Sequence, residues 1–66
     1  NQKLILPVLE AWEERLVNIG GSITDWRNLI VTYHSLGLTS EAEIKVIKAV
    51  KLLSLDGNEI EELRGF

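Results

Sequence analysis

The chain offers few side chains that could carry out catalysis. It has one histidine, His34, and no cysteine. A serine hydrolase site would need His34 as its general base. The other members available to such a site are Ser22, Ser35, Asp25 and Asp56. Neither serine lies in the sequence of a nucleophile elbow, so we expect no enzyme activity, no metal centre and no cofactor.

Carboxylates form two clusters that could take part in acid–base chemistry if burial separated their pKa values. The clusters are Glu10, Glu13 and Glu14, and Glu59, Glu61 and Glu62. Both fall on the polar faces of predicted helices, so we expect them to be solvated. The turn at residues 56–59 suggests a calcium loop, but the EF-hand register places Glu59 where a glycine is needed. This stretch therefore predicts a turn followed by a helix cap.

Three lysines, Lys45, Lys48 and Lys51, follow one another at intervals of three residues on a chain of net charge −3. We expect a solvated helix face. The alternative is a contact for an acidic partner, or for the Glu-rich ends of a second copy of the chain. The negative net charge argues against nonspecific binding to DNA or to anionic membranes. No apolar run is long enough to span a bilayer.

The elements that must position these residues are helices. Apolar residues recur at helical spacing over residues 7–19, 23–36 and 41–53, and again over 59–63, with an extension towards Phe66. The sequence therefore predicts an all-α bundle of three main helices and a short C-terminal helix, forming a single domain over 1–66. Because the chain begins at Asn1, we expect a fragment or processed piece of a larger protein.

Residues that start and stop helices mark the corners. Pro7 suits a first helical turn, and Gly20 with Gly21, then Gly37, suit helix ends. Three capping pairs are predicted: Ser22 with Asp25, Ser40 with Glu43, and Asn58 with Glu61. Segment 41–53 is apolar on more than one side, so we expect it to be packed between two other helices. The short connection at Gly37 predicts an antiparallel hairpin of the second and third helices.

Residues 23–54 resemble one tetratricopeptide repeat. The residues that carry the resemblance are Trp26, Leu29, Tyr33, Gly37, Ala42, Val46 and Ala49. Ser22 and Leu29 return as Asp56 and Leu63, at the family's period of about 34 residues. The sequence departs from the family where Ile30 replaces a small residue and Ser54 replaces a proline.

The resemblance implies a peptide-binding surface on the first helix of the hairpin. The positions on that face are Thr24, Arg27, Val31, His34 and Ser35. Arg27 is the first candidate to reach a carboxylate or a carbonyl of the partner. Val31 stands where carboxylate-clamping members of the family have asparagine, which sets this chain apart from that mode of binding.

We therefore expect a noncatalytic protein–protein interaction module that binds a peptide or a partner helix, or associates with itself through leftover apolar surface near Trp12 and Phe66. The alternatives are an unrelated three- or four-helix bundle, a scaffold piece of an enzyme or replication machine, and a helical DNA-binding or regulatory domain. In the last case segment 41–53 would be the recognition helix, and Glu41 and Glu43 at its start would repel phosphates.

Overall fold

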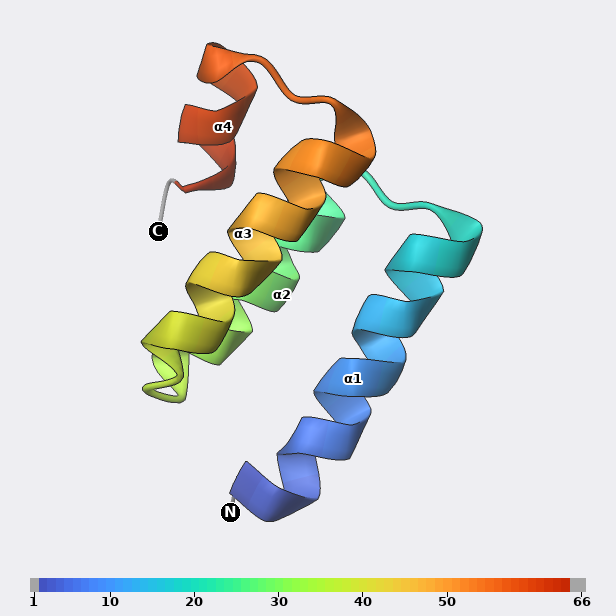
Figure 1. Cartoon of the computed structure of the whole chain (residues 1–66). Helices are drawn as coiled ribbons and strands as arrows, with labels where there is room; N and C mark the ends of the chain where they lie inside the picture. Colours follow the sequence, from blue (N-terminus) through green and yellow to red (C-terminus); the bar gives the residue numbers. More distant parts are fainter. Residues whose placement is uncertain (1, 65–66) are drawn as a thin grey trace.

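The fold consists of helices joined by short turns (Figure 1). The computed structural model describes residues 2–64, and the side chains of residues 4–64. The helices are α1 (Gln2–Ile19), α2 (Ile23–Ser35), α3 (Thr39–Leu53) and α4 (Gly57–Leu63), and the described residues contain no strand. The predicted all-α class, with three main helices and a short fourth, is confirmed. Phe66, at the end of the predicted last segment, lies outside the described residues.

The helices are arranged around α2. Helices α2 and α3 run antiparallel side by side, α1 lies along one flank of this hairpin, and α4 lies near the end of α3 (Figure 1). Helix α2 makes the main contacts with each of the other three helices. The central place that the sequence predicts for segment 41–53 therefore belongs to α2. Ile44 and Ile47, which made that segment look doubly buried, are about half exposed.

The core is closed mainly by the hairpin. The buried apolar side chains are Leu9, Leu16, Trp26, Leu29, Ile30, Tyr33, Ala42, Val46, Ala49 and Leu63. Six of them are the non-glycine residues that carry the resemblance described above. Ala42 and Ala49 are small, which lets α3 pack closely against the large side chains of α2. Full burial of each large aliphatic side chain is worth about 1.5–3 kcal/mol, so this interface supplies most of the apolar stabilisation.

The predicted signals around α2 are confirmed. The Ser22 backbone N–H donates to the Asp25 carboxylate at 2.9 Å, and the Asp25 N–H donates to the Ser22 hydroxyl at 3.3 Å, a reciprocal capping box. At the other end Gly37 has φ +79°, and its N–H donates to the His34 carbonyl. The Leu38 N–H donates to the Tyr33 carbonyl. This pair of bonds is a Schellman motif, which favours glycine at the left-handed position.

Helix α1 begins earlier than the sequence predicts. Pro7 lies inside the helix, which starts at Gln2. An interior proline lacks one backbone hydrogen bond and its ring crowds the preceding turn, which weakens a helix there, but residues 2–6 keep their helical backbone. The end of α1 is as predicted: Gly20 has φ +97° and its N–H donates to the Leu16 carbonyl.

Two of the predicted capping pairs are wrong. Helix α3 has Leu38 as its N-cap, without a side-chain hydrogen bond, so Ser40 lies within the first turn and forms no cap with Glu43. Glu43 instead pairs with Arg64, at 2.5 Å. Helix α4 starts at Gly57 and is capped by a different pair, Asp56 and Glu59, in place of Asn58 and Glu61. Each wrong pair lies two residues too far along the chain. At α4 the Asp56–Glu59 pair overlaps the predicted pair, whereas α3 starts after Leu38 without any side-chain cap.

Helix α3 ends at a residue in an unusual conformation. Ser54 has φ +53° and ψ +52°, the left-handed region, and the cap N–H donates to the Val50 carbonyl. The tetratricopeptide pattern has a proline at this position. Proline is fixed near φ −65° and cannot adopt this conformation. The departure at Ser54 therefore accompanies a different way of ending the helix.

Candidate interaction surfaces

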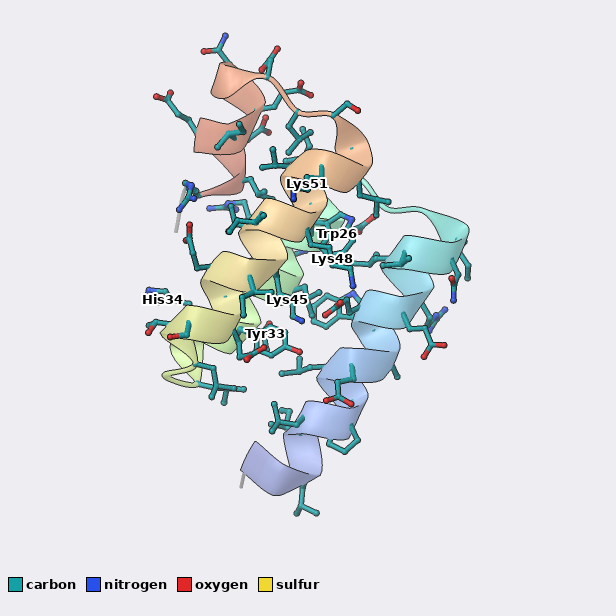
Figure 2. All side chains as sticks on the ribbon, in the orientation of Figure 1. Trp26, Tyr33, His34, Lys45, Lys48 and Lys51 are labelled. Carbon is teal, nitrogen blue, oxygen red and sulfur yellow. The ribbon has the colours of Figure 1, made fainter. Side chains whose placement is uncertain are left out.

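The partner-binding positions predicted on α2 form one open, mostly polar side of that helix. Thr24, His34 and Ser35 are exposed, and Arg27 and Val31 are half-buried. Figure 2 places His34 on the side of the hairpin turned away from α1. The groove described below does not include any of these five residues. Their role in binding stays a prediction.

The predicted lysine row is divided between two surroundings. Lys45 and Lys48 extend from α3 towards α1 (Figure 2), and both contact Glu13. The Lys45 Nζ lies 2.6 Å from Glu13 Oε1, and Lys48 donates to the other carboxylate oxygen. Lys51 is exposed. Two of the three lysines therefore have an acidic partner within the chain, and recognition of an outside acidic partner by this row stays a prediction.

Two further residues of the hairpin complete the surroundings of Lys45. The Lys45 Nζ lies 5.6 Å from the centre of the Tyr33 ring, within the range of a cation–π contact. It also lies 4.0 Å from the Glu41 carboxylate, the i,i+4 neighbour on α3. Burial raises the pKa of Tyr33, and the negative charge of nearby glutamates, Glu13 foremost, raises it further.

Glu13 is buried, which corrects the prediction that its cluster is solvated. Only 8% of its surface is exposed. Burial alone would raise the pKa of this carboxyl, but hydrogen bonds and positive charge from Lys45 and Lys48 together outweigh burial and hold the pKa below its ordinary value. The signal was present in the sequence: Leu9, Glu13 and Leu16 lie at i, i+4 and i+7, which places the carboxylate on the apolar line of α1.

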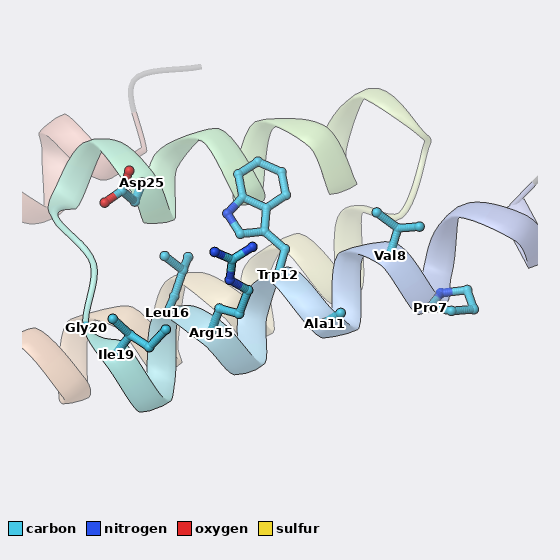
Figure 3. Close-up of a pocket in the computed structure, with 9 residues that line it drawn as sticks. All are labelled: Pro7, Val8, Ala11, Trp12, Arg15, Leu16, Ile19, Gly20 and Asp25. Carbon is cyan, nitrogen blue, oxygen red and sulfur yellow. The ribbon is translucent and has the colours of Figure 1, made fainter.

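A second, apolar surface lies on the flank of α1 that borders the start of α2. An open groove of about 740 Å³ runs along the helix (Figure 3). It is lined by Pro7, Val8, Ala11, Trp12, Arg15, Leu16, Ile19, Gly20 and Asp25. Figure 3 shows Trp12 and Arg15 extending from α1 in the direction of α2, where Asp25 lies. The groove therefore combines apolar walls with one cationic and one anionic side chain.

Val8 and Ile19, which line this groove, are large aliphatic residues exposed at the surface, and Leu4 lies one helical turn before Val8. Leu4 is 76% exposed, Val8 63% and Ile19 78%. With Ala11 and Arg15 they follow one line along α1, at i, i+4, i+7, i+11 and i+15, which a helix brings onto one face. We call these five residues the outer stripe. Sequence reasoning missed it, because an amphipathic pattern does not say which of two adjacent apolar lines will be covered.

Within residues 2–64, no group of His, Cys, Asp or Glu side chains is arranged to hold a metal ion. None of the helices in that range combines the length and the hydropathy needed to cross a bilayer. No protein-family model, no curated protein and no solved structure matches this chain. The likeness to a tetratricopeptide unit therefore stays a prediction.

Proposed function

We propose that this chain is a noncatalytic protein-interaction module whose α1 groove receives an amphipathic helix of a partner protein. The observation that carries the proposal is the outer stripe, in which Leu4, Val8 and Ile19 are each more than half exposed beside an apolar groove. Single exposed aliphatic residues are ordinary on protein surfaces. A contiguous line of them next to a hollow is typical of a protein-binding site.

The chemistry of the groove specifies the kind of partner. Helices that bind in grooves use apolar anchors at i, i+3, i+4 and i+7, and the outer stripe with Trp12 and Leu16 offers apolar contacts at that spacing. Arg15 is the cation among the residues that line the groove, and Asp25 is the anion. A helix that carries a carboxylate between two apolar anchors would therefore satisfy the groove better than a purely apolar one, because a guanidinium prefers a carboxylate partner.

The other functions considered have less support. DNA binding would rely on α3, where Lys45 and Lys48 are paired with Glu13. The α2 face of Thr24, Arg27, Val31, His34 and Ser35 remains a second, more polar candidate surface for the same module.

Selection from a displayed library of amphipathic helical peptides tests the proposal. The chain provides a pair of variants: Val8→Glu places a charge in the groove, and Ile44→Glu makes a similar change at a half-exposed residue of α3 that lines neither hollow of the surface. We expect selected peptides to lose roughly tenfold or more in affinity for the Val8→Glu protein, since a desolvated apolar anchor contact is worth about 1–2 kcal/mol. The Ile44→Glu protein should bind as the unmodified chain does.

Arg15→Gln sharpens the result. This substitution should lower the affinity for peptides that carry a central Glu and leave the affinity for the same peptides with Gln in its place unchanged. Peptides that bind the Val8→Glu and unmodified proteins equally would place the interaction elsewhere. Amide shifts confined to Thr24–Ser35 would then indicate the α2 face.

A further inference from the structure

Helices α1 and α3 together form a face of the molecule on the side away from α2. The two helices run in the same direction, and α3 lies in front of α2 in Figure 1. A hollow of about 260 Å³ lies between them, lined by Glu10, Glu13, Glu14, Val17, Lys45 and Lys48. The hollow shares no residue with the α1 groove. We call this surface the α1–α3 face, and it is separate from the groove.

Exposed aliphatic side chains lie on both helices of the α1–α3 face. Val17 of α1 is 37% exposed and lines the hollow. On α3, Ile44 is 51% exposed and Leu52 47%. Ile44, Lys48 and Leu52 follow one another at intervals of four residues, which places them on one side of α3. Because Lys48 lines the hollow, this row of α3 borders the hollow opposite Val17.

The charges that line the hollow are divided by sign, since α1 supplies glutamates and α3 supplies lysines. Lys51 extends the lysine side, three residues after Lys48. Lys48 contacts the buried Glu13 of its own chain. Glu14 and Lys51 are exposed, and neither forms an ion pair with another of residues 4–64. These two side chains therefore keep their charge for an outside partner.

Twofold symmetry makes the α1–α3 face complementary to itself. When two copies pack face to face about an axis parallel to the helices, α1 of each copy lies over α3 of the other, and heights along the axis are kept. Within one chain Glu13 contacts both Lys45 and Lys48, so Glu14 is nearly level with Lys48. Lys51 is one turn further along α3. Each Glu14 therefore faces the lysine side of the other copy.

We propose that two copies of this chain associate through their α1–α3 faces. Val17, Ile44 and Leu52 form the apolar centre of the dimer, and Glu14 of each copy pairs with Lys51 of the other. The dimer goes beyond the peptide-binding function above, because it leaves the groove open and each chain keeps its own fold. Exposed ion pairs are screened by salt, so the dimer dissociation constant should rise between about 0.05 M and about 0.5 M salt.

Complementary charge reversal tests the dimer. Glu14→Lys and Lys51→Glu each bring like charges together at both symmetric contacts, so either change should raise the dimer dissociation constant by roughly tenfold or more. In a 1:1 mixture of the two variants, opposite charges meet again at both contacts. We expect sedimentation equilibrium to show a heterodimer about as stable as the unmodified dimer. Both positions are exposed, so helicity should stay the same in each variant.

The control is Glu61→Lys, the same charge change at an exposed residue of α4. This variant should dimerise as the unmodified chain does. Equal weakening by Glu61→Lys and Glu14→Lys would show that net charge matters and the α1–α3 face does not, which overturns the proposal. An unmodified chain that stays single at every protein concentration, or a mixture that gains no mass over its components, would overturn it as well.

Ile44→Glu separates the dimer from peptide binding. A carboxylate in the apolar centre should raise the dimer dissociation constant by roughly tenfold or more, whereas this variant should keep the peptide affinity of the groove, as described above. An Ile44→Glu protein that dimerises like the unmodified chain would contradict the proposed interface. Loss of peptide binding in the unmodified dimer would contradict only the groove, so the two proposals can fail separately.

Discussion

The interface between α2 and α3 and the interface between α1 and this hairpin are built from different kinds of side chain. Between α2 and α3, side chains such as Trp26, Leu29 and Ala49 are fully buried and apolar. Between α1 and the hairpin, two buried leucines flank a carboxylate held by lysines. Apolar burial gains free energy in proportion to area, whereas an ion pair must first offset the desolvation of its charges. We therefore expect the hairpin to hold the fold and α1 to open before it.

The comparison predicts unequal opening. Local unfolding occurs where apolar contacts are few, at a free energy below that of global unfolding. Amides of α1 should then exchange with solvent through an opening that leaves α2 and α3 folded. Substitutions at the α2–α3 interface and at the α1 interface should therefore have different effects.

The largest effect is expected at the hairpin. Leu29→Ala should destabilise the chain by about 2–5 kcal/mol, the range for removing a fully buried leucine, and the global stability of a chain this small is itself only about 3–10 kcal/mol. Urea unfolding measures the loss. Leu52→Ala, at a half-exposed residue of α3, is the control and should cost less than about 1 kcal/mol. Equal losses would mean that the hairpin is not the dominant core.

A smaller and more local effect is expected at α1. Glu13→Gln should cost about 1–2 kcal/mol, less than a fully buried pair would, because the Lys48 side chain is 45% exposed although that of Lys45 is only 14% exposed. Hydrogen exchange should be faster for the amides of α1, and the exchange rates of Leu29 and its neighbours should be unchanged. The control is Glu14→Gln at the exposed neighbour. Uniform acceleration across all the helices would show that α1 and the hairpin open together.

The contribution of Glu13 should also depend on pH. Its pKa in the folded chain is below the ordinary value of 4.5, so its charge stabilises the folded state above pH 4.5. That stability is lost as the pH falls from 4.5 through the folded pKa. The unmodified and Glu13→Gln proteins should therefore differ at pH 7 and converge in acid. The pKa of Glu43, lowered by Arg64, changes both proteins alike and cancels. A difference that persists at low pH would mean that the substituted amide acts through packing and not through charge.

The smallest effects concern the helix starts. Ser22→Ala removes the capping box of α2 and should cost about 1 kcal/mol, which lowers the melting temperature by about 4–8 °C in a domain of this size. Ser40→Ala, at the cap that does not form, should stay within about 0.5 kcal/mol. Calorimetry of both proteins checks the pair. A larger loss at Ser40 than at Ser22 would reverse the assignment of the caps.

The same contrast explains what the sequence could predict. The hairpin follows from local signals: apolar spacing along α2, small residues on α3, and Gly37 between them. Glu13 was misjudged because three glutamates close together resemble a solvated face, and its lysine partners lie more than thirty residues away. The outer stripe was missed for a related reason, since the sequence shows that α1 is apolar but not which of its lines the hairpin covers. Ion pairs between residues far apart in the sequence could be identified only from the structure.

Ser54 limits which residues can stand at its corner. Its left-handed backbone conformation is most favourable for glycine and next most favourable for asparagine, and proline cannot adopt it. Proline at this position would require a different connection between α3 and α4, the helix that carries the buried Leu63. The residue type at position 54 of a related chain therefore predicts whether its third helix ends in the same left-handed conformation.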